Sequence, residues 1–353
     1  PLGGSPAVLG ERGAPSPILV MGAGAVGCYL GGRLQAAGVP VVFVGRPRVL
    51  AALREHGLTL TDLDGAHVRL APSDLALHDA VPPGLAPALV LLTVKSGATA
   101  EAAAQLAAAL PTGTPVVSMQ NGLSNAAVAQ AAAPALQLLA GMVPFNIAEL
   151  GPGRYHRGTT GTLAAQDDPA LRSRADDFAR ADLGLALHAD LTPIQWGKLM
   201  LNLNNPVNAL SGRPLRAELM ERDYRWCLAA LQAEALALLR AAGIAPAQVG
   251  AVAAHRIPPL LRLPTPLFRL VAARMLRIDP RARSSMADDL ALGRTTEIDA
   301  LCGEVVRLAA RLGRSAPVNA RMAELVTAWA QRPVPWSPAE LKAALRMKDV
   351  TGR

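Results

Sequence analysis

Short apolar runs alternate with Ala-rich helical stretches through the first half of the chain. The runs have the length and continuity of strands buried on both faces, and they lie at 17–22, 39–45, 88–94, 114–119 and 136–143. Helical spacing marks 25–38, which Gly38 ends, and 98–110. Strands that alternate with helices pair in parallel, so this half predicts a doubly wound parallel sheet. β-like runs around 152–165 and 184–189 predict a later, antiparallel extension of it.

Helical periodicity dominates from Asp190 onward. We expect helices over 191–210, 216–242, 246–255, 265–277, 281–312 and 317–331. A further helix opens at Ser337, where Ser337 and Glu340 form a capping box around Pro338. The chain is therefore interpreted as a disordered extension (1–16), an α/β domain (17–187) and an all-helical domain (188–353).

Composition narrows the class of protein. Three widely spaced cysteines make no disulfide framework, which favours a reducing, cytoplasmic compartment. The histidines lack ligand spacing, so no metal site is expected. No apolar run is long enough to predict a membrane span.

The net charge is +8, but the arginines are dispersed and aromatic residues make up only 3%. Anionic small molecules are therefore better partners than nucleic acid.

The first predicted strand ends in the glycine pattern GAGAVG, residues 22–27. Gly22 permits a tight turn, Gly24 lets the backbone approach a pyrophosphate, and Gly27 lets helix and strand pack closely. The helix N-terminus adds free N–H groups and a positive dipole. Between a strand and a helix this motif predicts a Rossmann-type dinucleotide site, formed by Gly22, Gly24, Ala25, Val26 and Gly27.

The end of the second predicted strand indicates which dinucleotide binds. An NAD site usually has Asp or Glu there, whereas this chain has Arg46 with Arg48 nearby. A guanidinium suits a ribose 2′-phosphate, so NADP(H) is expected at residues 17–187. The alternative is that Arg46 is a solvated loop charge.

Two scarce polar residues follow later strands. Lys95 ends the run 88–94, and Asn121 follows 114–119. Ligands of open α/β sheets lie outside the carboxyl ends of the strands, so both residues are candidates for cofactor binding. Their alternatives are a solvated charge and an Asn-Gly turn.

The segment 196–212 concentrates polar groups that are rare in this chain. It holds four of the eight asparagines and, at Lys198, one of the four lysines. In a continuous helix Asn202 lies about 40° from Lys198 and Asn205 about 20° on its other side, whereas Asn204 lies about 120° away. Pro206 would kink the helix and free the carbonyl of Asn202.

This polar stripe suits the reduction of a ketone. A positioned lysine can stabilise the charge that develops on a keto oxygen and donate a proton to it. We assign Lys198 as the general acid, with Asn202, Asn205 and Asn208 beside it as substrate-binding residues. The alternative is a structural helix whose amides bridge to the backbone. In 283–299, Ser285 could bind a carboxylate and Glu297 could accept from ribose or an active-site group; a solvated helix surface explains this segment equally well.

These motifs together resemble the ketopantoate reductase (2-dehydropantoate 2-reductase) family, within the 6-phosphogluconate dehydrogenase-like superfamily. The resemblance covers 17–331 and rests on GAGAVG, Lys95, QNG at 120–122, WGKLMLN at 196–202 and SSM…TEID at 284–299. It implies that Lys198 is the general acid and that Asn202, Asn205 and Ser285 bind substrate. It also implies that Glu297 organises the cofactor side of the catalytic site, and that Arg46, Lys95 and Asn121 contact NADPH.

One feature departs from the family pattern. In the family pattern, the asparagine that precedes proline is one position further from the lysine than Asn205 is from Lys198 in this chain. Asn204 directly precedes Asn205. Helical geometry favours Asn205 as the substrate contact. The resulting hypothesis is NADPH-dependent reduction of ketopantoate to pantoate, in pantothenate and coenzyme A synthesis, by a possible homodimer. Alternatives are a reductase of another small 2-keto or 3-hydroxy acid, and a non-catalytic NADP(H) sensor.

Overall fold

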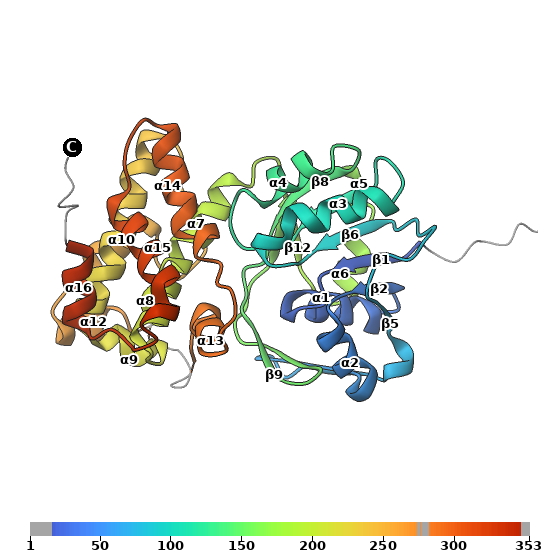
Figure 1. The fold of residues 1–353 in the computed structure, drawn as a ribbon, viewed down its shortest axis with the longest axis horizontal. Helices are drawn as coiled ribbons and strands as arrows, with labels where there is room; N and C mark the ends of the chain where they lie inside the picture. The colour runs from blue at the N-terminus through green and yellow to red at the C-terminus, as the bar shows by residue number, and fades with distance from the viewer. Residues whose placement is uncertain (1–15, 274–275, 277–281, 347–353) are drawn as a thin grey trace, which may run out of the picture.

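The structure, a computed structural model, describes residues 16–273, 276 and 282–346. It shows an N-terminal α/β part beside a helical part (Figure 1). The change from strand to helix falls between β12 (Leu185–His188) and α7 (Thr192–Asn202). Most of the predicted N-terminal extension, 1–15, lies outside the described residues.

The described part of the N-terminal half contains an eight-stranded sheet with β1 near its centre. Its spatial order is β12-β11-β8-β7-β6-β1-β2-β5. The strands are β1 (Ile18–Met21), β2 (Val41–Val44), β5 (Ala76–His78), β6 (Leu89–Leu92), β7 (Pro115–Ser118), β8 (Gln137–Met142), β11 (Leu163–Gln166) and β12. Neighbours from β5 to β8 pair in parallel, and β11 pairs antiparallel with β8. The predicted doubly wound sheet, its five strands and its antiparallel extension through β11 are confirmed.

Helices cover both faces of this sheet because its strands are apolar on both sides. Ile18 and Val20 of β1 pack toward α1 (Ala25–Ala36), whereas Leu19 and Met21 pack toward α3 (Thr99–Ala109) and α4 (Asn125–Ala132). The remaining helical segments of this half are α2 (Pro47–His56), η1 (Pro72–Asp74), η2 (Ser96–Ala98), α5 (Pro169–Arg172) and α6 (Ala175–Arg180).

A second sheet, of four described strands, packs on the other side of α1 (Figure 1). Its order is β4 (His67–Leu70), β3 (Leu58–Asp62), β10 (Arg154–Arg157) and β9 (Ile147–Gly151). The prediction that the run from 152 would extend the main sheet is therefore wrong for β10. The register of β10 beside β3, 92 or more residues earlier in the chain, is a long-range pairing that local pattern does not specify.

Glycines let α1 lie between the two sheets. A Cβ on Gly31 would come within 2.5 Å of Phe43 in the main sheet. A Cβ on Gly32 would come within 2.5 Å of Leu58 in the second sheet. Glycine in a helix interior costs about 0.5–1 kcal/mol relative to alanine. Close packing on both sides explains its presence here.

Buried charges join the second sheet to α1. The Asp62 carboxylate accepts from Arg33 of α1 at 3.4 Å and from Arg157 of β10 at 3.1 Å. All three residues are buried. Breaking such a group by removing one partner leaves uncompensated charge in the interior.

The helical part is more interrupted than its periodicity predicts. Its elements are α7, α8 (Asn204–Ser211), α9 (Leu215–Met220), α10 (Arg222–Ala241), η3 (Ala254–Arg256), α11 (Ile257–Leu261), α12 (Thr265–Val271), α13 (Ser285–Ala291), η4 (Ile298–Ala300), α14 (Cys302–Arg311), α15 (Pro317–Thr327), η5 (Ala328–Gln331) and α16 (Pro338–Arg346). Their apolar faces form one buried cluster that includes Trp196, Tyr224 and Met322.

Several predicted helices of this part need correction. The helix expected over 246–255 is wrong, since only its end is helical, as η3. The helix expected over 281–312 is divided into α13, η4 and α14, and 294–297 between them are a loop that contacts the sheet domain. Positions 274–275, 277–281 and 347–353 of the predicted helical segments lie outside the described residues.

The predicted start of the last helix is confirmed. Ser337 N–H donates to the Glu340 carboxylate at 3.0 Å, and Glu340 N–H donates back to Ser337 Oγ at 3.3 Å. Cys28, Cys227 and Cys302 are all free and buried. Among the described residues no helix combines the length and apolar character needed to cross a membrane.

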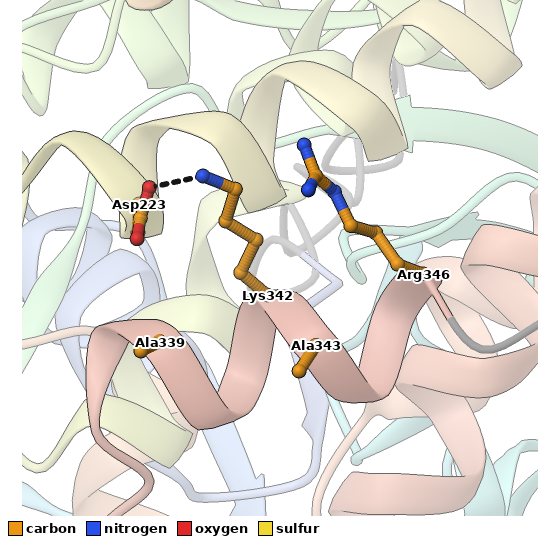
Figure 2. Close-up of a pocket in the computed structure, with 5 residues that line it drawn as sticks. All are labelled: Asp223, Ala339, Lys342, Ala343 and Arg346. Carbon is orange, nitrogen blue, oxygen red and sulfur yellow. Dashed lines mark hydrogen bonds and ion pairs between the residues drawn. The ribbon is translucent and has the colours of Figure 1, made fainter.

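An open surface hollow of about 450 Å³ lies on the outer side of the helical part. Figure 2 shows Lys342 of α16 reaching Asp223 of α10 across it, with Arg346 beside them. Its other lining residues are Ala339 and Ala343. None of the candidate site residues predicted from the sequence lines this hollow.

The Asp62 group provides a test of the fold. Asp62→Ala should lower the free energy of unfolding by about 3–5 kcal/mol, because two buried guanidinium groups lose their buried counter-charge and keep only the exposed carboxylates of Asp182 and Asp64. Urea unfolding followed by circular dichroism measures this change. Asp167→Ala, which removes an exposed pair with Arg172, is the control and should change stability little. Equal losses in the two variants would contradict the assigned role.

Candidate active site

The glycine turn has the geometry that its motif predicts. Gly22 follows β1 with φ +114°, a region that favours glycine, and a Cβ there would lie 2.6 Å from Val94 N. A Cβ on Gly27 would lie 2.1 Å from the Gly22 carbonyl oxygen. Thr93 Oγ1 donates to that oxygen at 2.8 Å and ties β6 to the turn. Gly22 and Gly27 are therefore required by the fold itself.

Gly24 differs from its two neighbours in the motif. A Cβ there would meet no atom within 4 Å. It is the N-cap of α1, and the N–H groups of Ala25 and Val26 have no hydrogen-bond acceptor among the described residues. Open space before unpaired helix N–H groups is what a pyrophosphate needs. These residues fit a dinucleotide.

Arg46 is exposed at the end of β2, where it is the N-cap of α2. Strand β2 adjoins β1 in parallel, so Arg46 lies at the same edge of the sheet as the glycine turn. This is where the adenosine ribose of a dinucleotide lies in such folds. The position suits a 2′-phosphate contact.

The strand-end residues Lys95 and Asn121 contact α13 and the loop that follows it in the helical part. Glu297 accepts from Ser96 Oγ at 2.9 Å, from Ser96 N–H at 3.1 Å and from Asn121 Nδ2 at 3.1 Å. Lys95 forms an ion pair with Asp289 at 2.7 Å and donates to the Thr295 carbonyl. The structure thus brings Lys95, Asn121 and Glu297 together. These contacts contradict the alternative in which 283–299 is only a solvated helix surface.

A second carboxylate of the helical part binds the next loop. Glu304 of α14 is buried and accepts from Ser124 N–H and Ser124 Oγ, both at 2.8 Å. Ser124 is the N-cap of α4, so the carboxylate lies at the positive end of that helix. A Cβ on Gly122 would come within 3.0 Å of Ala300. The loop carrying Asn121 is therefore held closely against the helical part.

Lys198 also bridges the two parts. It lies on α7, and its Nζ donates to the Pro144 carbonyl, beyond β8, at 2.7 Å. Burial lowers the pKa of Lys198 from 10.5 to about 8. Among the described residues no carboxylate forms an ion pair with it. A lysine with this pKa can release a proton near neutral pH.

The predicted continuous helix through the asparagines is wrong, but the kink is confirmed. The chain breaks at Leu203, between α7 and α8, since Pro206 has no N–H to bond the Asn202 carbonyl. Asn202 lies one helical turn after Lys198. The side chains of Asn202 and Asn205 make no hydrogen bond to any residue within the described ranges.

Asn204 and Asn208 have inward partners instead. Both donate to Glu218, at 3.2 and 3.0 Å, and Asn208 is completely buried. Asn208 Oδ1 accepts from the N–H of Ser284, which caps α13. The structure places Asn204 where geometry expected, away from Asn205. It places Asn208 in a structural network, and the predicted substrate contact of Asn208 stays a prediction.

Ser285, the first residue of α13, is exposed and is joined to the asparagine segment through Ser284. Ser284 Oγ donates to the Asn205 carbonyl at 3.2 Å. No hydrogen bond within the described ranges joins the group of Lys198, Asn205 and Ser285 to the group of Lys95, Asn121 and Glu297.

Sequence reasoning missed several polar residues of this region. Ser96 and Asn125 complete a network in which Asn125 Nδ2 donates to Ser96 Oγ and to the Asn121 carbonyl. Asn125 could have been found from the rarity of asparagine, as Asn121 was. Glu218 and Glu304 carry no such signal, since their importance arises from long-range contacts.

A glycine turn at the switch point of a doubly wound sheet, joined to helices that carry a desolvated lysine, defines a dinucleotide-binding protein with an oxidoreductase-type site. The family model "Ketopantoate reductase PanE/ApbA" matches residues 18–169, and its C-terminal counterpart matches 190–330. The 2-dehydropantoate 2-reductase of Halobacterium salinarum is 30% identical over 317 residues, 88% of this chain and 97% of that protein. The chain belongs to the ketopantoate reductase family.

Other relatives agree with this assignment. The 2-dehydropantoate 2-reductase of Archaeoglobus fulgidus is 27% identical over 88% of this chain and 96% of its own length. A PanE/ApbA family ketopantoate reductase from Ralstonia eutropha has a TM-score of 0.74 at 29% identity, covering 88% of this chain and 97% of that one. D-mandelate dehydrogenase with NADH has a TM-score of 0.72 at 19% identity, covering 94% of this chain and 100% of that one, which shows a shared fold.

Gly24→Ala tests whether Gly24 is needed for dinucleotide binding or only for the conformation of the turn. Nothing in the protein obstructs a Cβ at this position, so the free energy of unfolding should change by less than about 1 kcal/mol. Dinucleotide affinity should fall at least about tenfold, because the methyl group would occupy the pyrophosphate approach. Calorimetric titration and thermal unfolding measure the two effects. Unchanged affinity in the folded variant would contradict dinucleotide binding at the turn.

Proposed function

We propose that this protein catalyses the NADPH-dependent reduction of 2-dehydropantoate (ketopantoate) to pantoate. The observation that carries the proposal is Lys198, whose pKa burial lowers to about 8 at the contact between the sheet and helical domains. The names of the relatives from Halobacterium and Archaeoglobus support the choice of substrate. The reaction would serve pantothenate and coenzyme A synthesis.

The cofactor would lie along the edge of the sheet. Gly24, Ala25 and Val26 would hold its pyrophosphate, and Arg46 its 2′-phosphate. Lys95 and Asn121 would contact it further along, beside Glu297. Bound NADPH would supply the hydride. The protein side chains must then supply the proton and hold the acceptor in position.

Lys198 would supply that proton. Its ammonium is placed by the Pro144 carbonyl and can donate to the keto oxygen as negative charge develops there. Asn202 and Asn205 are without partners among the described residues and are available to orient the substrate, and Ser285 would bind its carboxylate. Contacts between the two domains would exclude water from the reaction.

A substrate panel tests this function. NADPH oxidation is followed by absorbance with ketopantoate and with other small 2-keto acids. We expect the largest kcat/KM with ketopantoate. A preference for another acid would shift the substrate assignment. Cofactor binding without turnover of any acid would instead favour a non-catalytic NADP(H) sensor.

Lys198 should set the pH dependence of the reaction. A general acid works in its protonated form, so kcat/KM for reduction should be constant below pH about 8 and fall about tenfold per pH unit above it. Lys198→Met should lower kcat by about 10²–10⁴-fold and retain NADPH affinity. The control is Lys342→Met, a lysine on the outer side paired with Asp223. A pH profile without this ionisation would oppose the assignment.

Arg46 should decide cofactor preference. Arg46→Ala should raise the KM for NADPH about tenfold or more, since it removes a charged hydrogen bond to the 2′-phosphate, and leave the KM for NADH unchanged. Arg54→Ala, on the same helix, is the control. Equal wild-type rates with NADH and NADPH would refute the role of Arg46. The predicted homodimer is checked by light scattering.

A further inference from the structure

A buried carboxyl group lies behind the predicted substrate-binding segment. Glu218 of α9 has no exposed surface. Its Oε2 accepts from Asn204 Nδ2 at 3.2 Å and from Asn208 Nδ2 at 3.0 Å, and its Oε1 has no hydrogen-bond partner among the described residues. Burying a carboxyl group with so few partners is costly, so this placement requires a reason.

The contacts of Asn208 continue toward α13. Asn208 Oδ1 accepts from the backbone N–H of Ser284 at 2.9 Å, and its Nδ2 also donates to the Arg213 carbonyl. Since both ends of one amide are engaged, rotation of Asn208 about its last torsion would break contacts on both sides. Glu218 and the Arg213 carbonyl, the two acceptors of Nδ2, therefore determine which end of Asn208 faces α13.

Ser284 connects this network to the face predicted to bind substrate. Its hydroxyl donates to the Asn205 carbonyl at 3.2 Å and accepts from Ala287 N–H at 3.2 Å. Ser284 thereby places Asn205 and the start of α13 against each other. Ser285, exposed, follows it directly. The chain of contacts runs Glu218, Asn208, Ser284, and ends between Asn205 and Ser285.

Asn204 is the second group that Glu218 holds. Its amide points to Glu218, and its Oδ1 is buried without a partner among the described residues. With its donor engaged in the interior, Asn204 is withdrawn from the substrate, and Asn205 is left to face it. The carboxyl group thus selects between two adjacent asparagines.

We propose that Glu218 is a positioning residue: by holding Asn204 and Asn208 it fixes Asn205 and Ser285 for the substrate carboxylate and hydroxyl. This inference rests on the proposed function for the identity of the substrate. It predicts an effect on substrate recognition, because the glycine turn and Arg46, which are predicted to hold the cofactor phosphates, lie on the other domain.

The burial of Glu218 makes Glu218→Gln a suitable conservative variant. Burial raises the pKa of Glu218 to about 8, so its carboxyl group is largely neutral at pH 7. Glutamine has the same shape, is neutral, and keeps an oxygen that can accept from Asn204 and Asn208. Glu218→Gln should therefore preserve the network, whereas Glu218→Ala removes its acceptor.

The first measurement is steady-state kinetics at pH 7 with the best 2-keto acid of the panel. Glu218→Ala should raise the KM for the acid at least tenfold and leave the Kd of NADPH within twofold, and Glu218→Gln should restore the KM to within threefold of wild type. The control is Glu234→Ala, which removes a carboxylate that accepts from Val318 and Asn319 in the same domain and should leave both constants unchanged. If Glu218→Ala does not fold, Asn208→Ala cuts the same chain of contacts and should give the same KM.

The second measurement does not depend on turnover. Amide hydrogen exchange in residues 282–292 should accelerate at least tenfold in Glu218→Ala and remain unchanged in Glu234→Ala, because the Ser284 N–H loses its positioned acceptor. If wild type reduces none of the acids, the proposed function fails and exchange alone decides this inference. A KM within twofold of wild type in folded Glu218→Ala, or unchanged exchange at 282–292, would overturn it.

Discussion

Two carboxylates of the helical domain hold the site together. Glu297 accepts from the loop after β6 and the loop after β7, and Glu304 accepts from the N-terminus of α4. These hydrogen bonds set the position of the helices relative to the carboxyl ends of the strands, where a dinucleotide binds. The lysine on α7 makes its own contact with the sheet domain at Pro144. Lys95, Asn121, Lys198 and Glu297 are all placed by this contact between domains.

The asparagine-rich segment shows how one stretch of chain serves two purposes. The break at Leu203 turns Asn204 and Asn208 inward, toward Glu218, and leaves Asn202 and Asn205 without partners in the described residues. Inward amides satisfy a buried carboxyl group, and the others are available for a ligand. Burial lowers the pKa of Lys198 to about 8, and an ammonium with such a pKa can donate a proton near neutral pH.

Helix α1 is under a tight steric constraint in the sheet domain. It is packed between two sheets, and Gly27, Gly31 and Gly32 provide the space. Only Gly24 of the glycine turn faces open space, so it alone distinguishes a demand of the ligand from a demand of the fold. The buried Asp62 group connects α1 with the second sheet.

The sequence by itself determined the parallel strands, the glycine turn, the caps and the candidate residues Lys95, Asn121, Lys198 and Glu297, because each depends on local periodicity or on the chemistry of a rare residue. It did not determine the second sheet, the division of 281–312, or the partners of Asn204 and Asn208. Those depend on residues distant in the chain, such as β10 beside β3 and Ser284 beside Asn208. Only tertiary packing decides which buried polar groups pair, since every such group must find its partner in three dimensions.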